Sequence, residues 1–228
     1  MGVSPGSAIT GFPPGIVQAP FTFHAGDAVA LQAQNDLTTA YNQAAGLAFT
    51  SNLTGQDLGG LTLTPGVYFF SSSAQLTGAL TLNFQGNSDA EFVFQIGSTL
   101  TTASGSSILL SNTGNGPTPG CEVFFQVGSS ATLGTTSAFQ GHILALTSIT
   151  LNTGATLNGS ALARNGAVTL DSNVITNTNC EAVATPTPEP ASVTLALVGG
   201  LLVGLPGLRK KLRVKNQDAG SVVLGGGK

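Results

Sequence analysis

Apolar positions recur at two different intervals along the chain, and the interval changes after residue 50. In residues 28–45, small and apolar residues return every three or four positions, which predicts a helix with an Ala-rich face. Asp27 is suited to cap its first turn, and Gly46 to end it. From about residue 58 to 175 the interval is two, which predicts β-strands. The protein is therefore expected to be mainly β, with one long helix.

The strand region repeats itself. An apolar–Thr–X triplet occurs six times, with its threonines 19, 20, 31, 18 and 19 residues apart, and the long step contains a Gly- and Pro-rich insertion at 112–120. Two further short apolar segments accompany most triplets. Three short strands in a turn of nearly constant length predict a β-solenoid with coils over about 58–180, because a sandwich would not repeat one triplet so evenly.

The three strands of a coil differ in their outward residues. The first is apolar on both faces, as expected where the Ala-rich helix covers it. In the second, the flanking apolar residues point inward and the threonine points outward. The sequence thus predicts one uncovered column of six threonines, flanked by Ser130, Ser148 and Asn152 and by Asn83 and Thr99. Its members are Thr62, Thr81, Thr101, Thr132, Thr150 and Thr169.

Charge is scarce. Only 7% of the residues are charged, against 41% hydrophobic, and the net charge is −3. Arg164 is the one Lys or Arg before residue 180, which argues against nucleic-acid binding and leaves little for acid–base catalysis. His142 has no second His or Cys at metal-ligand spacing, and we expect it to be a surface or packed residue. We expect no enzyme activity, no cofactor and no metal, and we expect Arg164 to make a local structural bond in the last coil.

The composition changes after Cys180. Residues 183–190 form a Pro-rich linker, and 191–208 are almost wholly apolar and precede a basic block, so 191–213 are expected to form a hydrophobic membrane helix. Residues 214–228 are expected to be disordered, which leaves 1–182 as the folded domain. Cys121 and Cys180 are expected either to form one disulfide or to remain free thiols, because sequence does not show their proximity.

Three segments resemble the large microbial ice-binding β-solenoid family: Gly2 to Gly15 (GVSPGSAITGFPPG), Leu63 to Tyr68 (LTPGVY) and Ala161 to Leu170 (ALARNGAVTL). In addition, Pro188-Glu189-Pro190 and the apolar and basic residues after it resemble a bacterial Pro-Glu-Pro sorting signal. Family members usually start with a signal peptide and a Thr-rich strand. No signal peptide is visible in residues 1–26, so we expect either a start assigned too late or a shortened homologue.

The resemblance implies a three-sided, right-handed solenoid with a helix alongside, and an exported monomer that binds ice through one flat face. The resemblance to a sorting signal implies export and contact with the membrane through the C-terminal segment before that segment is processed. The family's ice-binding face is often described by a Thr-Gly/Ala-X-Thr/Asn pattern, which Thr153-Gly154-Ala155-Thr156 fits on the predicted third strand. Two faces therefore compete, the threonine column and the face that carries Thr156. The alternative function is a structural or adhesive surface module that binds carbohydrate or another cell.

Overall fold

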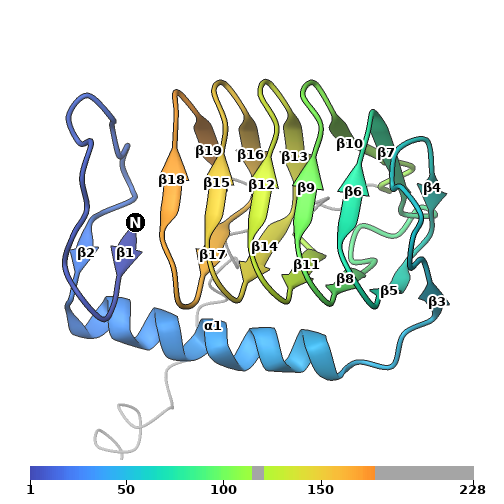
Figure 1. Ribbon diagram of the computed structural model, residues 1–228, viewed down its shortest axis with the longest axis horizontal. Helices are drawn as coiled ribbons and strands as arrows, with labels where there is room; N and C mark the ends of the chain where they lie inside the picture. The colour runs from blue at the N-terminus through green and yellow to red at the C-terminus, as the bar shows by residue number, and fades with distance from the viewer. Residues whose placement is uncertain (115–120, 178–228) are drawn as a thin grey trace, which may run out of the picture. The chain divides into compact units, whose positions relative to one another are not determined.

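The computed structural model describes residues 1–114 and 121–177. Strands that follow one another in the chain belong in turn to three different parallel sheets, so that the chain winds in coils (Figure 1). We call these sheets the helix-covered sheet, the threonine sheet and the third sheet. The helix-covered sheet contains β3 (Ser51–Asn52), β5 (Gly66–Phe70), β8 (Phe92–Ile96), β11 (Val123–Val127), β14 (His142–Ala145) and β17 (Ala161–Ala163).

The two other sheets follow the same order along the stack. The threonine sheet contains β6 (Ala74–Leu76), β9 (Leu100–Thr102), β12 (Ala131–Leu133), β15 (Ile149–Leu151) and β18 (Val168–Leu170). The third sheet contains β4 (Thr62–Leu63), β7 (Ala79–Asn83), β10 (Ser107–Ser111), β13 (Ala138–Gln140), β16 (Thr156–Asn158) and β19 (Val174–Thr176).

The core lies between the three sheets and is built by stacking. Every coil contributes inward residues that only the coils above and below can cover. Aromatic rings illustrate this: Phe94 is fully buried, and its ring lies 5.3 Å from that of Tyr68 and 4.4 Å from that of Phe125. Among residues 1–114 and 121–177 no further coil follows the last one, and its inward-pointing residues Val168 and Ile175 are each 38% exposed.

The corners between sheets require glycine. Gly141 and Gly159 lie in successive coils where the third sheet turns toward the helix-covered sheet, and both have positive φ. A Cβ added to Gly159 would come within 2.0 Å of the Gly141 carbonyl oxygen. Side chains at this corner would push adjacent coils apart, so the coil spacing depends on these glycines.

Helix α1 (Ala28–Gly46) lies alongside the stack and crosses successive coils (Figure 1). Its buried residues Leu37 and Tyr41 form a small cluster with Leu144 of β14, outside the main core. Its last turn is held by Gln95 of β8, whose amide nitrogen donates to the carbonyls of Ala44 and Leu47, each at 2.8 Å. The expected helix over 28–45 and its cover of one sheet are thus observed.

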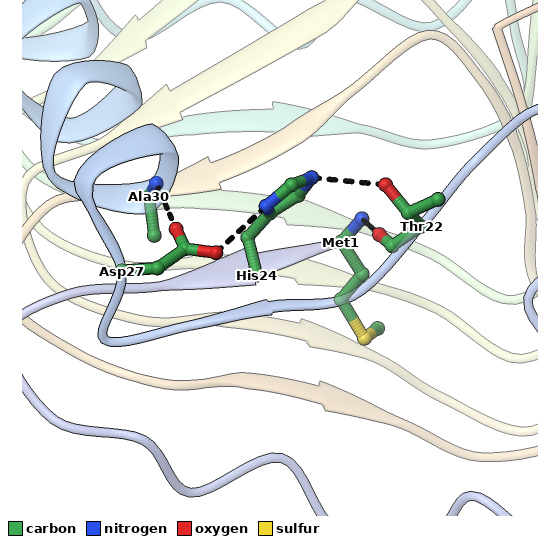
Figure 2. A network of polar contacts seen from close by, with 5 residues as sticks. All are labelled: Met1, Thr22, His24, Asp27 and Ala30. Carbon is green, nitrogen blue, oxygen red and sulfur yellow. Dashed lines mark hydrogen bonds and ion pairs between the residues drawn. The ribbon is translucent and has the colours of Figure 1, made fainter.

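A polar network joins the N-terminal segment to the first turn of α1 (Figure 2). The strands β1 (Gly2–Val3) and β2 (His24–Ala25) pair in parallel, which brings the start of the chain beside the residues that precede α1. The Asp27 carboxylate accepts a hydrogen bond from the Ala30 amide and lies against His24 Nδ1, both at 2.9 Å. The Ala30 amide, and after it His24, hold the pKa of Asp27 below its usual value of 3.8.

We expect the stabilisation that Asp27 provides to depend on pH. Its pKa is lower in the folded state, so its contribution is full above pH 3.8 and is lost as the pH falls through the folded-state pKa. Asp27→Ala should therefore unfold at a lower temperature than the wild type near neutral pH, and this difference should shrink in acid. Asp27→Asn, which keeps the cap acceptor, is the control. A difference between wild type and Asp27→Ala that does not change with pH would contradict this assignment.

One boundary differs from the expectation, and several features lie outside the described residues. The coils start at Ser51, because β3 already pairs with β5. Cys121 is disulfide-bonded, which excludes the free-thiol alternative for this residue. Its expected partner Cys180 lies outside the described residues, as do the linker at 183–190, the sorting segment at 191–213 and the tail at 214–228. Within residues 1–114 and 121–177, no helix has the length and hydropathy needed to cross a membrane.

Candidate functional site

The threonine sheet carries a column of outward threonines. Thr101 pairs in register with Thr132, Thr132 with Thr150, and Thr150 with Thr169. Their strands β9, β12, β15 and β18 lie side by side in Figure 1, with α1 to one side of them. We call these four residues the threonine column. Neighbouring members are spaced by the strand separation of about 4.8 Å.

The predicted column of six threonines is wrong for Thr62 and Thr81. Both residues lie on the third sheet, where they pair with each other, and Leu109 is the next residue in their row. Gln75 occupies the place beside Thr101 that the sequence interpretation gave to Thr81. The error arose because the 20-residue step from Thr81 to Thr101 resembles one coil but joins two different sheets.

A second column of hydroxyl groups runs parallel to the first. Its members precede the threonine column by two positions, which along a strand is about 6.6 Å. The Thr99 hydroxyl donates to Ser73 Oγ at 2.8 Å, and the Ser148 amide donates to Ser130 Oγ at 3.3 Å. We call this set the serine column; it consists of Ser73, Thr99, Ser130 and Ser148. The predicted flanking residues Thr99, Ser130 and Ser148 are therefore beside the threonine column, and Ser73 is a member that sequence reasoning missed. The prediction is wrong for Asn83, which pairs with Ser111 on the third sheet.

The strands beneath these columns are firmly packed. Leu100, Ala131 and Ile149 alternate with the outward residues, and none is more than 1% exposed. Threonine is β-branched and has few accessible rotamers on a strand. Backbone and side chains together therefore present a regular array of methyl and hydroxyl groups with little freedom to lose on binding.

The strands of the threonine sheet carry no charged residue, and carboxylates occur only at its margins. Asp171 follows β18, where its carboxylate accepts a hydrogen bond from the Thr153 hydroxyl. Three other acidic residues precede strands of the helix-covered sheet: Asp89 and Glu91 come before β8, and Glu122 comes directly before β11. There, burial and then the charges of Glu91 and Asp89 raise the pKa of Glu122. Charge is thus kept away from the two columns.

The competing face, on the third sheet, is less regular. Thr156 is exposed, but its neighbours in register are Ala138 and Val174, and Val174 is 58% exposed. The next row includes Leu109, which is 49% exposed. Thr153 and Asn152 lie at the corner after β15, between the two sheets. The Thr-Gly-Ala-Thr match therefore spans a corner, and its two threonines do not share a strand.

Arg164 and His142 have structural surroundings. The Arg164 guanidinium lies over the Tyr41 ring of α1, 4.8 Å from its centroid, so its side chain contacts the helix, whereas the sequence predicted a local bond within the last coil. His142 stacks on Phe124 with a centroid distance of 5.4 Å. Burial lowers the pKa of His142, although a hydrogen bond with the Cys121 backbone partly opposes this, so the neutral ring is favoured. In the described part of the chain, no group of three or more His, Cys, Asp or Glu is arranged to hold a metal ion.

Comparison with known proteins identifies the family. A family model described as "Ice-binding-like" matches residues 1–176, which include every coil. The chain belongs to this family. An ice-binding protein from Nostoc sp. (strain HG1) is 58% identical over 217 residues, covering 93% of this chain and 78% of the relative. One from Colwellia sp. is 39% identical over 145 residues, covering 63% of this chain and 54% of the relative.

Solved structures of ice-binding proteins share the fold. The chain resembles the protein from the ascomycete Antarctomyces psychrotrophicus with a TM-score of 0.70 and 42% identity, over 75% of this chain and 81% of that one. A protein from an Antarctic biological consortium gives a TM-score of 0.71 and 49% identity, over 76% and 78% of the two chains. The fold of this ice-binding family member is therefore mainly β, with parallel sheets and one long helix.

Proposed function

We propose that this chain binds ice through the threonine sheet, without catalysing a reaction, and thereby inhibits ice growth or recrystallisation. The observation that carries this proposal is the register of Thr101, Thr132, Thr150 and Thr169 on an uncharged sheet that α1 leaves uncovered. The ice-binding relatives support the function, and the geometry of the columns supports the choice of face. The three sheets form the three sides of the solenoid, and right-handed winding is the rule for parallel strands joined by crossovers.

The two columns would hold water in an ordered layer. The spacing along the stack is about 4.8 Å and the spacing along each strand about 6.6 Å, a two-dimensional grid on the scale of repeats in ice. Each methyl group favours leaving bulk water, while each hydroxyl can anchor one ordered water molecule. Protein adsorbed at many points forces the ice front to curve between them, which opposes further growth.

We also propose that the protein is exported and that it is a monomer. The Pro-Glu-Pro motif at 188–190, the apolar run and the basic residues after it support export, with processing at the cell surface and brief membrane contact through that segment. A disulfide between Cys121 and Cys180 would suit an exported protein. We propose that the ice-binding unit acts as a monomer, because ice itself is the extended partner.

Ice-affinity partition tests the function directly. When ice grows slowly from a dilute solution of the purified protein, we expect the protein to become enriched in the ice fraction. An inert protein of similar size is the control and should stay in the liquid, as would a module that binds only carbohydrate or another cell. Equal exclusion of this chain and the control from ice would contradict the proposed function.

A further inference from the structure

The threonine column does not extend over the whole threonine sheet. This inference rests on the proposed function and concerns where contact with ice ends. Gln75 in β6 continues the column beyond Thr101, and its side chain is exposed. Beyond Gln75 the same row continues to Asp57, which forms an isolated parallel bridge with it. Two of the six positions in this row are therefore Asp and Gln instead of Thr.

Gln75 differs from threonine in ways that matter for an ordered water layer. Its side chain is longer and unbranched, so more rotamer freedom would be lost on contact with a crystal surface. The surface beside it is also hollowed. A hollow of about 170 Å³ lies between β6 and β9, lined by Gln75, Leu76, Thr77, Thr101, Thr102 and Ala103. The level array of methyl and hydroxyl groups is interrupted at this coil.

The carboxylate next to Gln75 reinforces the interruption. Asp57 accepts hydrogen bonds from the Thr77 hydroxyl, from the Thr77 amide at 2.9 Å and from the Gly59 amide at 2.6 Å. Burial alone would raise the pKa of Asp57, but these hydrogen bonds outweigh it, and the pKa lies below 3.8. The Asp57 carboxylate is therefore ionised near neutral pH and places a negative charge beside Gln75. The Thr77 hydroxyl is also directed toward Asp57, so it is not free to donate to an ordered water.

We infer that Gln75 is the residue that limits the ice-binding site, and that contact with ice ends between β6 and β9. The site then comprises the coils of Thr101, Thr132, Thr150 and Thr169. Replacement of Gln75 by threonine would add a fifth member in register and extend the array by one coil. Gln75 is thus an affinity-determining position of the site, although it contributes no contact in the natural sequence.

The test compares Gln75→Thr with the wild type in recrystallisation inhibition. One more methyl group in contact should lower the half-effective protein concentration about four-fold. Gln140→Thr is the control, because Gln140 is a partly exposed strand residue on the third sheet; it removes the hydrogen bond that Asn158 Nδ2 donates to Gln140 Oε1 at 2.9 Å. It should leave the half-effective concentration unchanged. Thermal unfolding of both variants shows whether a change in activity comes from a change in stability.

The outcomes separate this inference from the proposed function. If Gln75→Thr has wild-type or weaker activity while a double variant with Thr132→Tyr and Thr150→Tyr is inactive, the inferred limit of the site is wrong and the proposed face is right. An equal gain from Gln75→Thr and Gln140→Thr would also overturn the inference. If neither Gln75→Thr nor the tyrosine variant changes activity, the threonine sheet is not the ice-binding face.

Discussion

Replacing Thr132 and Thr150 together with tyrosine is expected to abolish recrystallisation inhibition at concentrations where the wild type is fully active. The two residues pair with each other at the centre of the threonine column. Two bulky rings there would stand above the surface and hold the neighbouring Thr101 and Thr169 away from an ice plane. The whole array would lose contact, because a rigid flat sheet cannot bend around a protrusion.

The same replacement should leave the fold intact. Both side chains are partly exposed, tyrosine is a good strand residue, and the inward neighbours Ala131 and Ile149 are unchanged. The free energy of unfolding should therefore change by less than about 0.5 kcal/mol, as for most surface substitutions. Circular dichroism and thermal unfolding check this, and ice-recrystallisation assays measure activity.

Thr156→Tyr is the matched control for the choice of face. Thr156 is exposed on the third sheet, in the motif that competes with the threonine column. We expect this variant to retain activity. The opposite pattern, in which Thr156→Tyr is inactive and the Thr132 and Thr150 double variant is active, would move the ice-binding site to the third sheet.

Phe94→Ala is expected to cause the largest loss of stability, about 3–5 kcal/mol in the free energy of unfolding. The Phe94 ring is fully buried and stacks between Tyr68 and Phe125, which belong to the coils on either side. Its removal leaves a cavity that spans three coils, and the sheets cannot close it without losing their hydrogen-bond register. Denaturant unfolding measures the loss.

Phe49→Ala provides the comparison for this prediction. Phe49 also stacks on a neighbouring ring, that of Phe69 at 5.0 Å, but it is 52% exposed. Its removal should cost much less than that of Phe94, because most of its surface is already in water. Similar losses for the two variants would show that stacking of coils in the interior is not the main source of stability.

Local features of the fold could be predicted from the sequence because they depend on neighbouring residues. The three- to four-residue spacing and the Asp27 cap predicted the helix, and the observed Ala28–Gly46 differs by one residue. The interval of two predicted the strands, and the repeated triplet predicted that they stack as coils. The low charge and the threonine-rich strands pointed to the surface that we propose as the ice-binding face.

The sheet to which each threonine-containing strand belongs could not be predicted in the same way. Leu-Thr-Leu has the same alternation on either sheet, so the sequence did not show that Thr62 and Thr81 belong to the third sheet. The winding that leads from Gln75 to Thr101 is longer than most, because it has a long connection between β7 and β8. Ser73 and Thr99, which lie side by side, are therefore 26 residues apart in the chain. The Ser-Ala-Gln segment at 73–75 would have been a better signal for the strand that lies beside Thr101. Like Thr-Leu-Thr at 99–101, it has one apolar residue between two polar ones.

The sequence by itself determined that this protein is a stack of short strands with one helix, and that the central threonines of its repeated triplets point outward on strands with little charge, because periodicity and composition act locally. Only the tertiary structure decided which threonines share a column, that Gln75 interrupts it and that Gln95 holds the end of α1. The physical reason is that the lengths of the connections between strands determine which residues of successive coils lie in register. A column exists only when residues far apart in the chain are brought to the same side of the stack.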